Sequence, residues 1–426
     1  MLGRKVLVLI VWTSLLVVLV SCGNREHKES IILTINFPSE KLFFEMYGYD
    51  FEEKYPHINV KVIEKDTPLD FKEFFPDVLF FDQIHTYKKL INDGELLNLE
   101  KIISDAKYPI SELTPIVTDS LKSEKDQLFG LSPSFISYAI YYNKDIFAEY
   151  DVSFPKNQMT WIEVLDLAKQ FPNKNSDGEA LYGFKSNYYK DIAFSMILRA
   201  GQTEGLTFID PSTLKVNFNS PEWNVIFNNV IDAFREGAIY SKEYDPNGEV
   251  EPAPILTGKT AMEIQSYSTA YNFESYSNFI GGDKIDWDIV TVPVSTRDRN
   301  KSDFYEIQEI YSISSRTEHK EDSWKLIDFI TKNRAENQEE KQLLGLPAQI
   351  DLIKSVNEHD ISPLFFLEPA NNNNDPYEFV DYNVINAFKE LGQSLIEEAI
   401  NNSNNNIEDL IKRIEIEGQK VIDSLK

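Results

Sequence analysis

The sequence of 426 residues has little cysteine, little histidine and an excess of acidic over basic side chains. A single cysteine excludes an intramolecular disulfide and any zinc or iron–sulfur site built from several thiolates. The five histidines are not spaced as metal ligands, and no metalloprotease or serine-hydrolase signature is present. With 42 basic and 69 acidic residues, the net charge of −27 disfavours binding to nucleic acid or to anionic lipid headgroups.

The long apolar run at the N-terminus ends at the single cysteine. Residues 6–20 follow two basic residues and are fewer than the ~20 that a permanent membrane helix needs. The sequence LVSCG at residues 19–23 places small residues before Cys22, as in a bacterial lipobox. We therefore expect a lipoprotein signal peptide over residues 1–21, palmitate-type acylation of Cys22 and a tether over residues 22–30. The protein is then expected to be anchored by lipid to the cell membrane, facing the extracellular side.

Hydrophobic patterns after the tether predict an α/β fold. Between apolar runs, Phe43, Tyr47, Phe51 and Tyr55 recur every four residues, which indicates one face of a helix. Thr160 and Glu163 have the spacing of a capping box and predict the start of another helix. Strands that alternate with helices over short links are typical of parallel α/β units. The expected strands are 31–37, 58–64, 77–81, 138–143, 261–265 and 287–292, and the expected later helices are 322–333, 384–400 and 407–425.

A series of short motifs is distributed over residues 31–426. They are PDV at 76–78, FFD at 80–82, GELL at 94–97, GLSP at 130–133, YYNKDIF at 141–147, MTW at 159–161, GKTAM at 258–262, VPV at 292–294, YSIS at 311–314 and GLP at 345–347. In order and spacing this series resembles the family-1 extracellular solute-binding proteins. Those are carbohydrate-binding lipoproteins that serve ABC importers.

The resemblance implies a two-lobe clamp like that of periplasmic binding proteins, with discontinuous lobes joined by three hinge crossovers. Such a protein captures a carbohydrate, here expected to be an oligosaccharide, in the cleft between its lobes and delivers it to the permease subunits. It is expected to act as a monomer, without catalysis. By its motifs the N-terminal lobe is expected at residues 31–137 plus 291–342, and the C-terminal lobe at residues 138–290 plus 343–426.

Candidate sugar-binding residues lie near strand ends, where α/β proteins bind their ligands. A pyranose stacks its apolar face on aromatic rings and offers a rim of hydroxyls to polar side chains. Tyr188 and Tyr189 match the segment that supplies a stacking aromatic in maltodextrin-binding relatives. The full set of candidates is Asn36, Phe37, Phe81, Asp82, Tyr138, Tyr188, Tyr189, Gln265, Tyr267 and Trp287. The identity of the sugar stays open.

One loop has part of the pattern of a calcium site. Asn173, Asn175, Asp177 and Glu179 supply oxygens at alternating positions around a glycine, but the glutamate expected at the twelfth position is missing. A turn rich in asparagine and aspartate explains the same residues without a metal. A structural calcium ion therefore stays an alternative, and no other cofactor is expected.

Two other classes of function fit parts of the sequence. Glu306 and Glu309 are spaced so that they could serve as the acid and base of an exported glycan hydrolase, although so acidic a chain has many such pairs by chance. A clamp fold does not fix its ligand, so a peptide or another polar solute is the second alternative. Turnover of a glycan would indicate the hydrolase, and indifference to glycans would indicate the peptide binder.

Overall fold

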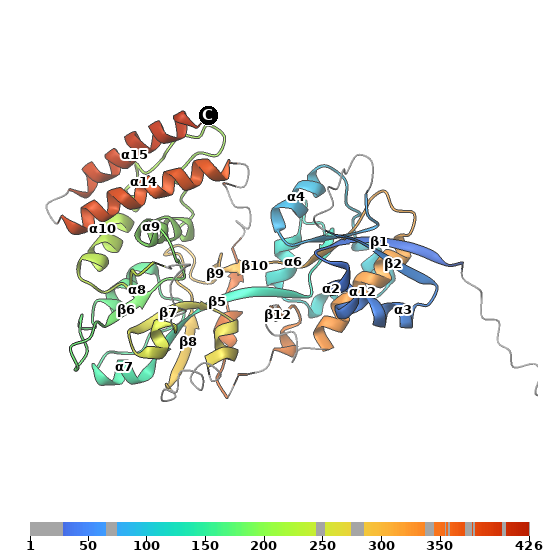
Figure 1. Cartoon of the computed structure of the whole chain (residues 1–426), viewed down its shortest axis with the longest axis horizontal. Coiled ribbons are helices and arrows are strands. Elements are labelled where there is room, and N and C mark those ends of the chain that lie inside the picture. The colour runs from blue at the N-terminus through green and yellow to red at the C-terminus, as the bar shows by residue number, and fades with distance from the viewer. Residues whose placement is uncertain are drawn as a thin grey trace, which may run out of the picture. The chain divides into compact units, whose positions relative to one another are not determined.

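The computed structural model describes residues 29–64, 75–243, 252–273, 285–336, 345–353, 355–356, 358–370, 377, 380–402 and 406–425. The chain divides into two compact units, which meet in the sequence between Asp77 and Val78. Helices and strands alternate along both units (Figure 1), as the sequence predicts for an α/β protein. The lobes expected from the motifs divide the chain at other positions than these two units do, and they stay a prediction.

In the first unit, the structure describes two parallel strands and the helical segment between them. Strand β1 (Ile31–Phe37) pairs with β2 (Ile58–Glu64), with Ile31 opposite Ile58. The side chain of Ser39 caps the helical segment by accepting from the amide of Leu42. The segment consists of α2 (Glu40–Phe43), the π-helical turn η1 (Phe44–Gly48) and α3 (Tyr49–Lys54).

The π turn explains how a strict four-residue repeat stays on one side of a helix. Phe43, Tyr47 and Phe51 are all buried, whereas Tyr55, the last member of the predicted repeat, is half-buried and caps the C-terminal end of α3. In a regular α-helix, side chains four residues apart drift slowly around the axis, because one turn holds 3.6 residues. A π turn takes up an extra residue. The three rings therefore stay on the buried face, as the sequence pattern predicts.

The longer described strands of the second unit form two groups, the first antiparallel and the second mixed. One group has the order β3 (Val78–Phe81), β11 (Ile310–Ile313), β4 (Gly130–Leu131), and β11 is antiparallel to both neighbours. The other has the order β10 (Tyr305–Glu306), β5 (Ser134–Asn143), β7 (Thr260–Ser266), β6 (Tyr182–Lys185), and β8 (Trp287–Thr291) and β12 (Leu346–Pro347) also pair with β5. Strands β9 (Lys301–Ser302) and β13 (Glu368–Pro369) form a short parallel pair.

Strand β5 begins at Ser134, four residues before the strand that the sequence predicts. Its first part pairs with β12 and β10, so that Ser137 lies opposite Tyr305. From Tyr138 onward it pairs with β7 and β8. Serine has low strand propensity, and the early part of β5 is extended because distant segments pair with it. The partners of β5 therefore change between Ser137 and Tyr138, beside one of the expected crossovers.

The helices follow the sequence pattern closely. The expected helices 322–333, 384–400 and 407–425 are confirmed, with ends shifted by a few residues. The capping box is confirmed as well, because the Glu163 amide donates to Thr160 Oγ1 at 3.3 Å and the Thr160 amide donates to Glu163 Oε2 at 2.7 Å. The α-helices of the second unit whose bounds the structure describes are α4 (Ile84–Asn92), α5 (Glu100–Asp105), α6 (Pro115–Leu121), α7 (Lys144–Glu149), α8 (Trp161–Ala168), α9 (Ile192–Thr203), α10 (Pro221–Arg235), α12 (Lys320–Glu336), α14 (Tyr382–Asn401) and α15 (Ile407–Ser424).

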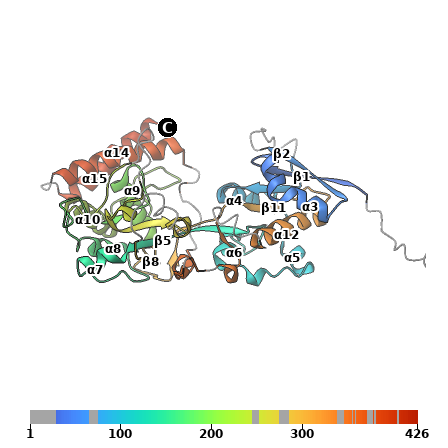
Figure 2. The ribbon, with the colours of Figure 1, turned by 60° about the horizontal axis from the view of Figure 1, so that its bottom comes forward.

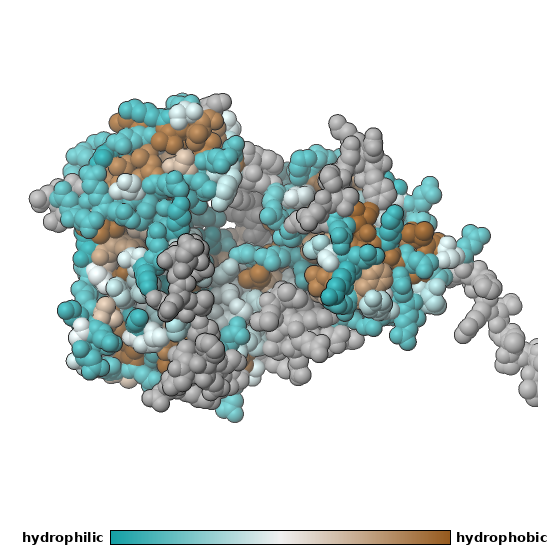
Figure 3. Space-filling view, in the orientation of Figure 1, coloured by the Kyte–Doolittle hydropathy of each residue, from teal (hydrophilic) through white to brown (hydrophobic). Residues whose placement is uncertain are grey.

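An aromatic cluster fixes the positions of α9 and α14. The ring of Phe388 on α14 lies 5.7 Å from that of Phe194 on α9 and 5.6 Å from that of Phe208. Figures 1 and 2 both show α14 and α15 side by side, next to α9 and α10. On the face shown in Figure 3 the surface is mainly hydrophilic, with apolar side chains gathered over α15, where Ile416 is exposed. The packing of α9 against α14 matters because both helices line the pocket described next.

Candidate functional site

A pocket of about 590 Å³ in the second unit is the best candidate for a ligand site. Its walls come from α4, α9 and α14 and from the segments around Leu206 and Tyr377, which are far apart in the sequence. Its volume suits a small organic ligand, because ligand pockets usually measure ~300–1,000 Å³. The polar and aromatic side chains of its wall include Lys88, Tyr188, Arg199, Gln202, Tyr382 and Lys389.

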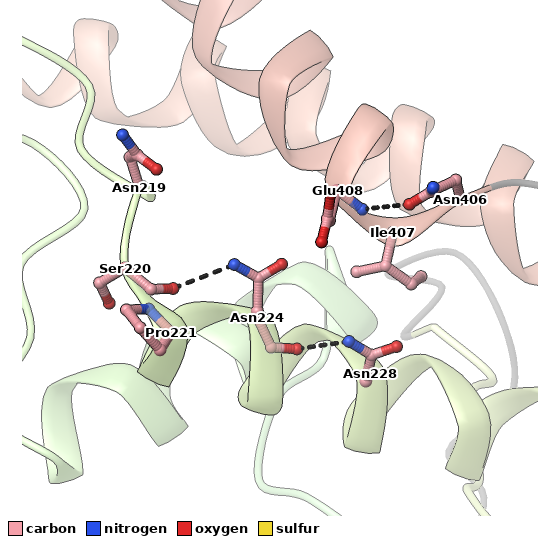
Figure 4. Close-up of a pocket in the computed structure, with 8 residues that line it drawn as sticks. All are labelled: Asn219, Ser220, Pro221, Asn224, Asn228, Asn406, Ile407 and Glu408. Atoms are coloured by element: carbon pink, nitrogen blue, oxygen red, sulfur yellow. Dashed lines mark hydrogen bonds between the residues drawn. The ribbon is translucent and has the colours of Figure 1, made fainter.

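A second pocket, of about 580 Å³, lies between the first turns of α10 and α15 (Figure 4). The amides of Asn224 and Asn228 donate to backbone carbonyls one turn earlier, at 3.1 and 2.7 Å. Asn406 accepts from the amide of Glu408 at 2.8 Å. Among the residues that the structure describes, no aromatic side chain lines this pocket. It therefore offers no stacking surface for a sugar ring, and the first pocket is the better candidate.

Arg199 is held rigidly in the wall of the first pocket. Its Nη2 atom donates to the backbone oxygen of Asp303 at 3.1 Å and to Asp303 Oδ1 at 3.2 Å. The guanidinium carbon lies 3.7 Å from the centre of the Phe304 ring. The side chains of Arg199 and Asp303 are only 14% and 11% exposed, so solvent screens this ion pair weakly. These contacts fix the orientation of Arg199 relative to any ligand.

Tyr138 also contacts the ring of Phe304 and is a fixed hydrogen-bond donor. Its hydroxyl donates to Glu306 Oε1 at 2.8 Å, and its ring packs edge-on against Phe304 at 6.3 Å. Burial, followed by the negative charge of Glu306, raises the pKa of Tyr138. The hydroxyl therefore keeps its proton over the physiological range of pH. Glu306 also accepts from the side chain of Gln308 at 3.2 Å, which makes it a hydrogen-bonded carboxylate.

Tyr188 and Tyr189 precede α9 and differ in exposure. Tyr188 is half-buried and lines the pocket, and burial raises the pKa of its hydroxyl. Tyr189 is 60% exposed, and the Lys185 Nζ atom lies 5.5 Å from the centre of its ring. Exposed tyrosine rings are suitable stacking surfaces for the apolar face of a sugar. The structure thus brings predicted residues Tyr138, Tyr188 and Tyr189 into the neighbourhood of Arg199.

Gln265 belongs to a buried polar network beneath Tyr189. Its amide donates to Glu263 Oε2 at 2.8 Å, and Lys185 Nζ lies 4.0 Å from the same oxygen. The Oε1 atom of Glu263 accepts from the hydroxyl of Thr260 at 2.6 Å and from the amide of Ile255 at 2.7 Å. Glu263 is completely buried, so these donors replace the water that its charge would otherwise require. The network ties Gln265 and Lys185 together.

Of the ten predicted ligand residues, Tyr188 alone is among the described residues that line this pocket. In the first unit Asn36 is half-buried, and Phe37 packs edge-on against Phe43. In the second unit Asp82 is exposed, whereas Phe81, Tyr267 and Trp287 are buried. The Trp287 ring stacks on that of His359 at 3.9 Å and on that of Phe273 at 4.8 Å. A ligand-binding role for all ten predicted residues stays a prediction.

Sequence reasoning missed the helical part of the pocket wall because it searched the ends of strands. Arg199 and Gln202 are polar residues one turn apart in the largely apolar helix α9, and this pattern was a usable signal. Lys88 and Lys389 look like ordinary surface lysines in the sequence. Tyr382 begins α14 and is 75% exposed, but nothing in its local sequence separates it from other tyrosines.

The structure describes the predicted calcium loop but not the predicted lipid-attachment site. Asn175 Oδ1 accepts from the amides of Asp177 and Glu179, at 3.1 and 2.8 Å, and Gly178 has φ of +83°, as in a tight turn. Within the described residues no group of three or more His, Cys, Asp or Glu side chains is arranged to hold a metal. The calcium site stays a prediction. Cys22 and residues 6–20 lie outside the described residues, and no described helix is long and apolar enough to cross a membrane.

Comparisons with known proteins agree with this architecture. The family of bacterial extracellular solute-binding proteins matches residues 49–347. No protein of curated function matches the sequence. Similar solved structures include a sugar transporter of Rhizobium etli in an open conformation, with 16% identity and a TM-score of 0.62, which covers 92% of this chain and 99% of its own.

Two further similar structures are of a sugar-bound protein and a sugar-binding protein. An ABC substrate-binding protein of Listeria monocytogenes in complex with cycloalternan has 19% identity and a TM-score of 0.53, over 93% of this chain and 99% of its own. The sugar-binding protein MalE of Xanthomonas citri has 12% identity and a TM-score of 0.63, over 92% and 98%. At such low identity these likenesses show the fold alone. They confirm the expected α/β fold class of two-lobe periplasmic binding proteins.

Proposed function

Because the chain belongs to the bacterial extracellular solute-binding protein family, we propose that it captures a carbohydrate and delivers it to the permease of an ABC importer. The proposed binding site is the pocket between α4, α9 and α14. Two of the similar structures are described as sugar-binding or sugar-bound proteins, which supports a sugar as the ligand. The protein holds its ligand without changing it.

The composition of the pocket wall is the observation that carries this proposal. Tyr188 and Tyr382 provide aromatic surface, while Arg199 and Gln202 provide hydrogen-bonding groups on one helix. A pyranose needs both, because its ring has an apolar face and its hydroxyls need directional partners. The rigid position of Arg199 lowers the entropy that is lost when a ligand is ordered against it.

We propose that the mature protein is a lipoprotein anchored through Cys22 on the extracellular side of the cell membrane. The support is the lipobox-like sequence at residues 19–23 after a short apolar run. A lipid anchor places the binding site near the permease without requiring attraction between an acidic protein and an anionic membrane. Mass spectrometry of the membrane fraction tests it, with a Cys22→Ser variant that remains soluble as the expected result.

A thermal-shift screen of oligosaccharides tests the proposed function. A sugar present at 100 times its dissociation constant stabilises the folded protein by ~2.7 kcal/mol. We expect Tyr382→Ala to reduce the affinity for that sugar, because the variant removes the exposed ring from the pocket wall. The matched control is Tyr49→Ala, since Tyr49 is 67% exposed and does not line the pocket.

Three results of this screen count against the proposal. Equal loss of affinity in both tyrosine variants would separate binding from this pocket. A shift with peptides and none with any sugar would identify a peptide binder. Release of smaller glycans during incubation, followed by chromatography, would identify a hydrolase, and Glu306 and Glu309 would then be its candidate residues.

A further inference from the structure

The charge that α9 contributes to the pocket wall already has a partner. Arg199 lines the pocket and pairs with Asp303 at 3.2 Å, and the two side chains are 14% and 11% exposed. Asp303 is not among the described residues that line the pocket. Opposite charges so close together largely cancel at distances greater than their separation. A ligand that reaches this part of the wall therefore meets a compensated ion pair.

The hydrogen bonds of Arg199 also limit what its guanidinium can hold. Nη2 donates to the backbone oxygen and to Oδ1 of Asp303, at 3.1 and 3.2 Å, and Nη1 donates to Gln202 Oε1 at 3.3 Å. An arginine grips a carboxylate with two parallel N–H groups from one edge of its planar fork, and each such edge includes Nη2. Because Nη2 is engaged by Asp303, neither edge is left for this grip. The N–H of Nε and the second N–H of Nη1, which have no partner among the described residues, can each make one hydrogen bond.

Asp303 depends on Arg199 as much as Arg199 depends on it. Its Oδ2 atom is buried and has no hydrogen-bond partner among the residues that the structure describes. A buried carboxylate with so few donors is stable only while its cation stays in place. Tyr188, which lines the pocket, senses both charges: burial raises the pKa of its hydroxyl most, Arg199 lowers that pKa and Asp303 raises it. These two opposite effects agree with a compensated pair beside the pocket.

The neighbours of Arg199 on the same face of α9 are neutral. Ser195, Arg199 and Gln202 are four and three residues apart, so they lie along one side of the helix, and all three line the pocket. Hydroxyl and amide groups both donate and accept hydrogen bonds, as the hydroxyls of a neutral sugar require. A carboxylate on the ligand only accepts, and it gains little net attraction from the ion pair. This side of the wall therefore suits uncharged oxygens.

The lysine on the α14 side of the wall also has an acidic neighbour. Burial is the largest effect on the pKa of Asp191 and raises it, while the positive charges of Lys190 and Lys389 lower it. Lys389, which lines the pocket, is thus close enough to the Asp191 carboxylate to interact with it. Arg199 and Lys389 each have a carboxylate nearby, on two different sides of the pocket.

We propose that Asp303 determines the specificity of the pocket, because it neutralises Arg199 and so favours a neutral sugar oxygen over an anionic group at α9. Asp303 acts through Arg199 and is thus a positioning residue. The inference rests on the proposed function and adds to it the charge of the ligand and the residue that sets it. Removing the negative charge of Asp303 should open the same site to acidic sugars.

Calorimetric titration of the wild type and of Asp303→Asn tests the inference. The probes are mannobiose, cellobiose, galactobiose and maltose, each beside the uronate in which its primary hydroxyls are oxidised to carboxylates. Any neutral sugar found by the wider oligosaccharide screen is added with its uronate. We expect the wild type to bind the neutral member of a pair at least as tightly as the uronate. In Asp303→Asn the uronate-to-neutral affinity ratio should rise about tenfold or more, and this gain should shrink between about 50 and 500 mM salt.

Asp303→Asn separates the charge of this residue from its position. The asparagine oxygen can accept from Arg199 Nη2 as Oδ1 does, and the amide nitrogen takes the place of Oδ2, which has no described donor to lose. The matched control is Asp409→Asn, which removes the same charge from a side chain on α15 that is 76% exposed and does not line the pocket. It should leave the ratio unchanged. Melting temperatures show whether each variant remains folded.

A double variant tests the pair as a unit. Asp303→Asn with Arg199→Met removes both charges, a change that buried ion pairs often tolerate better than the loss of one partner. Because the intact pair is compensated, the double variant should keep the uronate-to-neutral ratio of the wild type. It should also lack the gain shown by Asp303→Asn, since the cation responsible is gone. If Asp303→Asn does not fold, the double variant still decides, because a tenfold lower ratio than in the wild type would show that Arg199 attracts anions despite Asp303.

The possible failures are distinguishable. If neutral sugars bind and a folded Asp303→Asn variant leaves the ratio unchanged, the inference is wrong and the proposed function stands. The inference is also wrong if the wild type binds a uronate tenfold more tightly than its neutral partner, or if Asp409→Asn raises the ratio as much as Asp303→Asn. If neither the paired probes nor the wider oligosaccharide screen yields a ligand for the wild type, both the inference and the proposed function fail.

Discussion

Replacing Glu263 by glutamine should destabilise the protein strongly, although the change exchanges a single oxygen for an amide nitrogen. Glu263 is fully buried and accepts three hydrogen bonds, from Thr260, Ile255 and Gln265, while Lys185 lies 4.0 Å away. In Glu263→Gln, the oxygen can stay with the first two donors. The new NH₂ group then faces the Gln265 amide and Lys185, both of which present donors.

The magnitude follows from the groups that lose a partner. A hydrogen bond to a charged group contributes about 1.5–3 kcal/mol, and breaking a buried ion pair from one side costs about 3–5 kcal/mol. The contact with Lys185 is long, and Gln265 can rotate its amide, so we expect about 3 kcal/mol. At about 2 °C per kcal/mol for a large domain, the melting temperature should fall by roughly 6 °C.

A double-mutant cycle separates this reason from a general loss of packing. Lys185→Met in the Glu263→Gln background removes the second buried charge, so the double variant should be more stable than the sum of the single effects. Urea unfolding followed by tryptophan fluorescence measures each free energy. The control is Glu368→Gln at an exposed position, for which we expect a change below about 0.5 kcal/mol.

Strict additivity of the two substitutions would refute the reasoning, because it would mean that Lys185 and Glu263 do not interact in the folded protein. So would a Glu263→Gln variant as stable as the wild type. Since Lys185 also lies over the ring of Tyr189, we expect the same variant to weaken sugar binding. That effect should be smaller in the double variant if methionine still packs against the ring.

Two further predictions concern packing and pH. Gly392→Ala should destabilise the protein by about 1–3 kcal/mol, because a Cβ at Gly392 would lie 2.1 Å from the Phe194 ring. Urea unfolding measures this loss of stability, and the additional substitution Phe194→Leu should relieve the clash. A Gly392→Ala variant as stable as the wild type would show that α14 shifts freely. The hydrogen bonds from Arg299 and then from the Thr160 amide lower the pKa of Glu163 below its usual 4.5. The ionised Glu163 side chain therefore stabilises the folded protein fully above about pH 4.5, and this stabilisation is lost as the pH falls through the lowered pKa of Glu163. The difference in melting temperature between wild type and Glu163→Gln should close between about pH 5 and about pH 3, and a constant difference would contradict this cause.

The elements of the fold could be predicted wherever their signal is local. The Thr160–Glu163 capping box and the four-residue repeat of Phe43, Tyr47 and Phe51 involve neighbours in sequence, and both are confirmed. Strand β5 was predicted too short because its first residues are extended only through pairing with distant strands. The π turn within the first helical segment was also missed, since the same repeat fits a regular helix almost as well.

The candidate site could be predicted only in part. Tyr188 was selected because it matches a family segment, and it lines the pocket, whereas Tyr138 and Tyr189 are not among its lining residues. Tyr382, Lys88 and Lys389 were not found, because each has an ordinary surface pattern and becomes part of a wall only when three helices meet. Trp287 is the opposite case: it was predicted as a ligand residue because it is an aromatic residue at a strand end, but its ring stacks on those of His359 and Phe273.

The sequence by itself determined the α/β class, the family and the positions of most helices and strands, because caps, repeats and motifs act over a few residues. It also placed the single cysteine at the end of an apolar run, which is the basis of the proposed lipid anchor. Only the tertiary structure decided which tyrosines are exposed and which charges face the pocket. Burial and pairing depend on residues more than a hundred positions apart, as in the contact between Arg199 and Asp303. A strongly acidic chain could therefore build a pocket wall with lysines and without described carboxylates, which no composition reveals.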